Sequence, residues 1–344
     1  MNRVIRRRQT YISRLYYILI LSFFVSITSY AQPGKINGLS VVAPPTEFAQ
    51  DPFPRIMETH ADWVCFIPYG FSQFGNTSLS YNMDRQWWGE REAGIIESIR
   101  LAQKHNLKIF LKPQVYVPGS WAGDVDFLSE EDWKLWEDNY RAFILFYADI
   151  ASSFDVDLFC IGTELKKAVQ KRPEFWISLI TEIRKIYCGG LTYSANWDSY
   201  DNAPFWDLLD YIGISAYFPL VDEKKPSIKK IKSAWKPIVK KLSKSNKKYN
   251  KPILFTEYGF LTVDGTTYQN WELEKKINVL SVNEKAQADA LDAMYSVFSE
   301  VNFWAGGFLW KWFPNDQGHE GYIKKDYTPK DKMAEEILKK WFKQ

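Results

Sequence analysis

The chain has 344 residues, with 44 Lys and Arg against 41 Asp and Glu, and its formal net charge is +3. The length allows one large domain with a sizeable core, and no internal repeat or low-complexity linker divides it. Five arginines and no acidic residue fall within residues 1–31, so the remainder carries a charge of −2, and nothing in this balance indicates a nucleic-acid partner.

The first 31 residues have the features of a secretory signal peptide. A basic start with five arginines precedes an apolar stretch, 15–28, which has the length of a signal core and is short for a membrane span. Small residues then occupy Ser29 and Ala31, as at a cleavage site. We expect removal of 1–31 near Ala31, export of 32–344 to the periplasm or medium, and no stable membrane association afterwards. An uncleaved anchor is the alternative.

Eight short apolar runs follow, separated by longer segments of helical periodicity. The runs are rich in Val, Ile, Leu, Phe and Gly, which is typical of parallel strands that are buried on both faces. The predicted strands are 38–43, 62–67, 107–112, 157–162, 191–195, 211–215, 253–256 and 305–309.

The segments between these runs predict helices. Segment 227–244 places its apolar residues on one stripe and its lysines opposite, which indicates a solvated helix face. Strands alternating with helices predict a (β/α)8 TIM barrel, a single α/β domain over 32–344. Long loops after strands two, three and seven are expected to build a cleft. The predicted helices are 90–105, 130–153, 173–187, 227–244, 283–299 and 330–342.

The cysteines and histidines form no metal or nucleophile motif. Cys65 and Cys160 lie inside apolar runs, where a thiol packs as a small hydrophobe. The three cysteines are odd in number and have no CxxC spacing, so we expect neither a disulfide framework nor a zinc site. The three histidines have no metal-ligand spacing, and no glycine-rich phosphate loop follows the first strand. We therefore predict no cofactor and no metal.

Two glutamates end two of the predicted strands. Glu164 closes the run 157–164, and Glu257 closes the run 252–257. In a TIM barrel, chemistry takes place at the C-terminal ends of the strands. Retaining glycoside hydrolysis needs two carboxyl groups about 5–5.5 Å apart, one as proton donor and one as nucleophile. Either residue alone is an ordinary strand-end carboxylate, but the pair predicts a glycosidase.

These segments resemble the clan A glycoside hydrolases, which carry a Glu at the ends of strands four and seven. Within the clan, the chain is similar to glycoside hydrolase family 113, whose known members are β-1,4-mannanases. The similarity covers nearly the whole mature chain and implies that Glu164 is the acid/base and Glu257 the nucleophile. The segments that carry it are 65–71, 111–114, 161–165, 193–197 and 254–259.

The resemblance also implies substrate contacts. An aromatic at the end of strand eight, here Trp310, would form the floor under the cleaved sugar, and a tyrosine after strand six, here Tyr217, would orient Glu257. Tyr258 is the alternative orienting residue, and Tyr217 is alternatively a core aromatic. Much of the clan has Asn before the acid/base, where this chain has Thr163, so Asn196 is our candidate for the sugar 2-hydroxyl.

Further candidates come from the strand ends and loops. Lys112 ends the third strand, where it would bind a sugar hydroxyl, offset the two carboxylates, or pair with a loop acid. The chain has 15 Trp, 20 Tyr and 23 Phe, which suits a cleft that stacks on sugar rings, although most of these aromatics are expected in the core. Five aromatics in or beside predicted loops are candidate platforms: Phe71, Trp87, Trp88, Trp121 and Trp197.

Together these features predict a secreted retaining endo-β-1,4-mannanase. Its partner would be a β-linked oligo- or polysaccharide, either mannan or glucomannan. The alternatives are a xylanase, glucanase or exo-mannosidase of the same clan, because fold does not determine specificity, and a carbohydrate-binding barrel without catalysis. The sequence specifies no oligomeric state.

Overall fold

The computed structural model describes residues 34–316 and 318–344. The predicted signal peptide, 1–31, lies outside the described residues. Within the described part, no helix combines the length and apolar character needed to cross a membrane.

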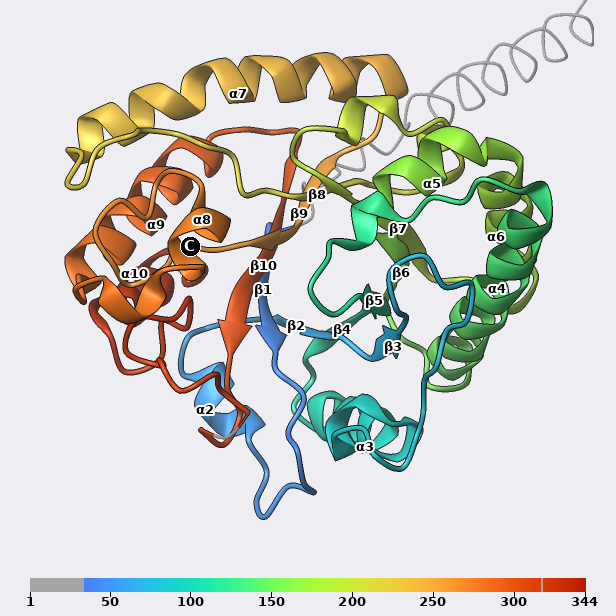
Figure 1. The fold of residues 1–344 in the computed structure, drawn as a ribbon. Helices are drawn as coiled ribbons and strands as arrows, with labels where there is room; N and C mark the ends of the chain where they lie inside the picture. Colours follow the sequence, from blue (N-terminus) through green and yellow to red (C-terminus); the bar gives the residue numbers. More distant parts are fainter. Residues whose placement is uncertain (1–33, 317) are drawn as a thin grey trace, which may run out of the picture. The chain divides into compact units, whose positions relative to one another are not determined.

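Eight parallel strands close into a barrel in the order β1-β10-β9-β8-β7-β6-β4-β2 (Figure 1). All eight predicted strands are present, displaced by a few residues at most, and the predicted TIM barrel is confirmed. The strands are apolar because helices cover the outer face of the barrel and side chains fill its interior. The strands are β1 Ile36–Val41, β2 Trp63–Phe66, β4 Lys108–Leu111, β6 Leu158–Thr163, β7 Gly190–Asn196, β8 Ile212–Ser215, β9 Ile253–Tyr258 and β10 Trp304–Trp312.

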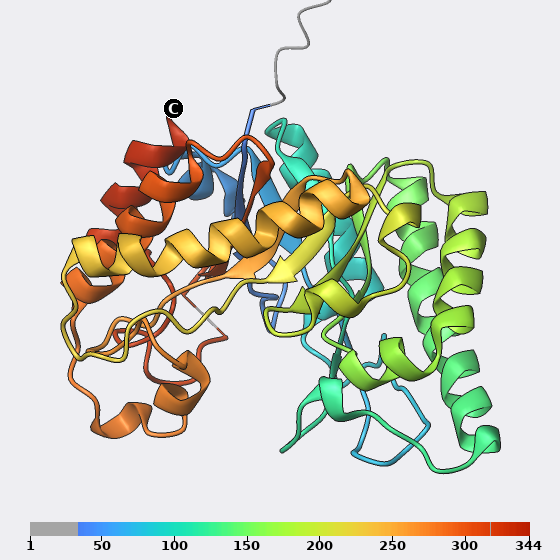
Figure 2. The ribbon, with the colours of Figure 1, turned by 90° about the horizontal axis from the view of Figure 1, so that it is seen from above.

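Helices surround the barrel, and the long α7 runs across its outside (Figure 2). The six predicted helices are confirmed as α3, α4, α6, α7, α9 and α10. Side-chain caps begin three of them: the hydroxyl of Ser129 accepts from Asp132 N before α4, that of Ser227 accepts from Lys230 N before α7, and the side-chain oxygen of Asn283 accepts from Ala286 N before α9. The helices are α2 Phe53–Met57, α3 Glu92–Lys104, α4 Glu130–Ser153, α5 Lys166–Lys171, α6 Pro173–Ile186, α7 Ile228–Tyr249, α8 Asn270–Glu274, α9 Glu284–Phe298 and α10 Met333–Phe342.

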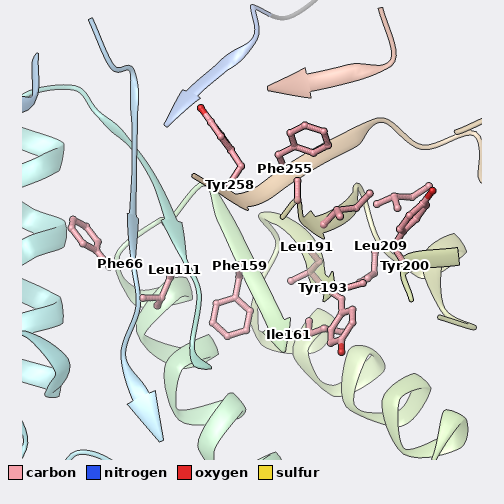
Figure 3. Close-up of a cluster of buried hydrophobic side chains, with 14 of the residues drawn as sticks. Phe66, Leu111, Phe159, Ile161, Leu191, Tyr193, Tyr200, Leu209, Phe255 and Tyr258 are labelled. Carbon is pink, nitrogen blue, oxygen red and sulfur yellow. The ribbon is translucent and has the colours of Figure 1, made fainter. Parts of the chain in front are cut away.

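Side chains alternate along each strand between two apolar layers. Phe159, Ile161 and Phe255 point outward into the large layer between the barrel and its helices (Figure 3). Leu158, Cys160 and other inward residues fill the barrel itself. Cys65 and Cys160 are buried in this inner layer, as the sequence predicted.

The short elements of the loops were not predicted. Strands β3, Tyr69–Phe71, and β5, Gln114–Tyr116, pair as a separate two-stranded parallel sheet beyond the ends of β2 and β4. Each has three residues, too few for periodicity to indicate a strand. This sheet extends the wall of the barrel on the side of β2 and β4.

Candidate active site

The two predicted glutamates lie at the C-terminal ends of β6 and β9, each beside an irregularity in the strand. Phe255 pairs with Ile214 and Glu257 with Ser215, so β9 has one residue more than β8 at this point. The register of β9 against β10 shifts at the same place. An extra residue of this kind re-aims the side chains that follow it, and such bulges are frequent next to active sites.

The carboxylate of Glu257 is held by two side chains. The ammonium of Lys112 donates to Oε2 at 2.5 Å, and the hydroxyl of Tyr217 donates to Oε1 at 2.6 Å. Lys112 is fully buried, and Glu257 is 13% exposed. Burial alone would lower the pKa of Lys112, but the charge of Glu257 outweighs it and the pKa is raised. Each oxygen of the Glu257 carboxylate is thus paired with a donor, one a buried cation and the other a phenol.

Of the two tyrosines considered for orienting Glu257, the structure brings Tyr217 to it. Tyr258 points the other way: it is 1% exposed, and its hydroxyl lies 2.5 Å from that of Tyr295 on α9. Because of the bulge, Glu257 faces the barrel mouth while the next residue faces the helices. The alternative that Tyr258 orients Glu257 is therefore wrong.

Glu164 follows β6 directly, with a backbone φ of +55°, which non-glycine residues seldom adopt. Its backbone N–H donates to the carbonyl of Ser194 at 2.8 Å. Its carboxylate Oε2 accepts a hydrogen bond from the indole of Trp121 at 2.6 Å. Burial raises the pKa of Glu164, and the nearby charge of Glu257 raises it further, while the Trp121 bond opposes both.

The two carboxyl groups therefore have different environments. Glu257 has a cation and a phenol as partners, which suit a carboxylate, whereas Glu164 is desolvated and lies within electrostatic reach of Glu257, which favours its proton. Neighbouring carboxyl groups in environments that separate their proton affinities are the arrangement expected of an acid and a nucleophile.

A cleft of about 920 Å³ opens at the same end of the barrel, although neither Glu164 nor Glu257 is among its lining residues. Trp310, at the end of β10, lies on its wall, together with the predicted platforms Phe71 and Trp87. Trp87 is 41% exposed, so part of its side chain is accessible to a ligand. Two lining residues, Tyr69 and Glu90, were not singled out from the sequence, because neither lies at the end of a predicted strand.

The remaining candidates lie outside this cleft. Asn196 ends β7, and its amide donates to Asp198 at 3.0 Å. Trp197 stacks on Trp271 with ring centroids 6.1 Å apart. Trp88 is 8% exposed and packs edge-on against Phe48, which makes it loop core rather than a platform. Trp121 acts on Glu164 through its indole nitrogen, a contact that its loop position did not reveal.

A second buried lysine, Lys311, follows Trp310. Its ammonium lies 2.7 Å from Glu320 and 3.3 Å from Asp326. Burial raises the pKa of Glu274 on α8 to about 7; the charge of Lys311 opposes this rise, and the charges of Asp326 and Glu320 add to it. Lys311 therefore balances a group of acids beside the cleft. Across 34–316 and 318–344, no group of three His, Cys, Asp or Glu side chains is arranged to hold a metal ion.

Comparison with known proteins identifies the family whose profile the chain matches. The sequence profile of Glycoside Hydrolase Family 113 matches residues 45–332. No curated protein matches the chain.

Three solved structures illustrate the shared fold. A family 113 β-mannanase from Alicyclobacillus acidocaldarius in complex with ManMIm has a TM-score of 0.77 at 24% identity, covering 90% of this chain and 97% of that one. A family 113 β-1,4-mannanase has a TM-score of 0.76 at 26% identity, covering 90% and 99%. A β-glucuronidase from Ruminococcus gnavus has a TM-score of 0.57 at 15% identity, covering 90% and 50%.

Proposed function

The chain belongs to glycoside hydrolase family 113 and is a glycoside hydrolase, and we propose that it is a retaining endo-β-1,4-mannanase acting on mannan or glucomannan. The observation that carries the proposal is the pair of strand-end carboxyls, Glu164 desolvated and Glu257 paired with Lys112 and Tyr217. The mannanase specificity draws on the family 113 structures, two of which are described as β-1,4-mannanases.

In the first step, Glu257 is the nucleophile. Its carboxylate oxygen bonds to the anomeric carbon as the glycosidic C–O bond breaks, and Glu164 gives its proton to the departing oxygen. Lys112 and Tyr217 hold the carboxylate of Glu257 in position before the attack. The raised pKa of Glu164 keeps its proton available near neutral pH.

In the second step, water replaces the ester. Once Glu257 is esterified, its negative charge no longer favours the proton on Glu164, so Glu164 takes a proton from water. The hydroxide oxygen bonds to the anomeric carbon, and the ester C–O bond breaks to release Glu257 as a carboxylate. Two inversions give net retention. Trp121 favours the ionised Glu164 that acts as base in this step.

Substrate class is tested by a timed digest of mannohexaose beside xylohexaose and cellohexaose, with products resolved by length. Mannobiose and mannotriose formed from mannohexaose alone would support an endo-mannanase. Release of one sugar at a time would instead indicate exo action, and turnover of another hexaose would change the substrate.

The roles of the two glutamates are tested by azide rescue on an activated aryl β-mannoside. With Glu164→Ala, azide should attack the glycosyl ester and give the β-mannosyl azide. With Glu257→Ala, azide should displace the leaving group directly and give the α-mannosyl azide. Exchange of these two products would reverse the assignment, and wild-type turnover by either variant would refute it.

The proposal includes export of the mature enzyme after cleavage near Ala31. It rests on the basic and apolar pattern of residues 1–31. Mass spectrometry of the expressed protein's N-terminus tests it, and recovery of the intact N-terminus in membranes would support the uncleaved anchor instead.

A further inference from the structure

At one wall of the 920 Å³ cleft lies a buried carboxyl group that the two-glutamate mechanism does not use. Glu90, in the short helix η1, Trp88–Glu90, is 8% exposed and lines the cleft. A carboxyl group seldom occupies such a position without a partner that satisfies it.

Glu90 is held from one side by Gln86. The Gln86 Nε2 donates to Glu90 Oε2 at 3.2 Å and to the carbonyl of Tyr69 at 2.9 Å, while its Oε1 accepts from Met83 N at 2.9 Å. Two backbone groups thus hold the amide of Gln86 in place, and its third hydrogen bond reaches the carboxylate. Within the described residues, Gln86 is the side chain that donates to the Glu90 carboxylate. Most acceptor positions of this carboxylate therefore remain for a ligand.

Tyr69 relates this carboxyl to the catalytic pair. Burial raises the pKa of the Tyr69 phenol, and the charges of Glu257 and Glu90 raise it further, so its hydroxyl lies within the field of both carboxyls. Tyr69 and Trp310 line the same cleft as Glu90. Tyr69 is therefore near both Glu257 and Glu90, and it shares the cleft wall with Glu90.

The position of Glu164 sets the direction of a bound chain. The general acid must reach the glycosidic oxygen, so the leaving group lies toward Glu164 and the retained sugars lie away from it. Most residues that line the cleft lie in or after β1, β2 and β10, with Tyr116 and Pro118 from the segment after β4, whereas Glu164 follows β6. Sugars on the non-reducing side would occupy this cleft.

An aromatic platform adjoins the carboxyl. Trp87 precedes η1, lines the cleft and is 41% exposed. A carboxylate that accepts from two sugar hydroxyls, beside an aromatic plane under the apolar face of the ring, is a chemically complete site for one pyranose.

From this arrangement we infer that Glu90, positioned by Gln86 and assisted by Trp87, binds a sugar unit on the non-reducing side of the cleaved one and sets the enzyme's preference for longer chains. The inference rests on the proposed function for the identity of that sugar, a β-linked hexopyranose. Glu90 accepts hydrogen bonds from two neighbouring hydroxyls of this sugar and takes no part in bond cleavage.

The test compares Glu90→Gln with the wild type on dinitrophenyl β-mannoside, β-mannobioside and β-mannotrioside. Glu90→Gln removes a charge-assisted acceptor, so kcat/KM should fall roughly 10- to 100-fold for those substrates that are long enough to reach Glu90. For the monoside, kcat/KM should stay within about 2-fold of the wild-type value. Glu92→Gln is the matched control, since Glu92 is exposed and pairs with Asn82. Trp87→Ala, at a half-exposed position, provides a second variant with the same expected length dependence if Glu90→Gln fails to fold.

Binding separates this inference from the proposed function. Mannotriose is titrated into the Glu164→Ala protein, with and without Glu90→Gln, and followed by tryptophan fluorescence. We expect binding at least 10-fold weaker with the second substitution. Equal binding, or a kcat/KM loss that is the same for all three lengths, would overturn the inference. A wild type that binds mannotriose but hydrolyses nothing would refute the proposed function and leave the role of Glu90 standing.

Discussion

The ammonium of Lys112 lies 2.5 Å from the carboxylate of Glu257, although 145 residues separate the two along the chain. Lys112 extends from the end of β4 and is fully buried, and Glu257 comes from β9. The contact crosses the mouth of the barrel, so the lysine neither reaches a loop acid nor stands free for a sugar. It supplies the positive charge beside the proposed nucleophile.

Replacing this lysine should weaken catalysis more than folding. We expect Lys112→Met to lower kcat/KM roughly 100-fold or more, because the ionised form of Glu257 loses its cation. Lys108→Met, on the exposed start of the same strand, is the control. Steady-state kinetics measure both variants, and an unchanged kcat/KM for Lys112→Met would show that Lys112 has no electrostatic role.

The two tyrosines near Glu257 should behave differently. Tyr217→Phe removes the hydrogen bond to Glu257 Oε1, and we expect kcat to fall roughly 10-fold or more with little change in unfolding. Tyr258→Phe removes the contact with Tyr295, so it should cost about 1 kcal/mol of unfolding free energy and leave kcat unchanged. Steady-state kinetics and urea unfolding measure both. A loss of kcat with Tyr258→Phe, together with a loss of stability with Tyr217→Phe, would instead place Tyr258 in the active site.

Trp121 should tune the proton on Glu164. Its indole stabilises the ionised carboxylate, so Trp121→Phe should raise the pKa of Glu164 further. The acid must be protonated for the first step, and the basic limb of kcat/KM should therefore move to higher pH. Trp341→Phe, which loses an indole bond to Asp292 outside the site, is the matched control. A shift to lower pH would contradict the proposed role.

Stability at low pH should depend on Glu335. Burial alone would raise the pKa of Glu335, but its hydrogen bonds with Arg55 outweigh burial and lower the pKa to about 2. The stabilisation is present above the ordinary glutamate pKa of about 4.5 and is lost as pH falls toward 2. Glu335→Gln should cost roughly 1–3 kcal/mol at pH 7.

This difference from the wild type should disappear near the lower pKa, because both proteins then carry a neutral side chain at position 335. Thermal unfolding across pH 2.5–7 measures it. Glu336→Gln, at a neighbouring side chain that is 74% exposed, should change stability little. A constant difference at all pH values would assign the effect to packing.

Much of the fold followed from local pattern. Apolar runs flanked by helical periodicity located all eight barrel strands, and a strand buried on both faces must carry such a run wherever it occurs. The ends of those runs also indicated Glu164 and Glu257, since parallel strands present their carboxyl ends on one face. The short strands β3 and β5 escaped prediction because three residues have no measurable period.

Local pattern was enough to predict the barrel, the strand ends and the pair of carboxyls. Which of the candidate groups reach those carboxyls became clear only from the folded arrangement. Lys112, Tyr217 and Trp121 reach the two glutamates across many residues of chain, and one extra residue in β9 turns Glu257 toward the mouth and Tyr258 toward the helices. Glu90 was identified from its burial in the wall of the cleft. Such contacts depend on barrel closure and strand register, which local periodicity does not specify.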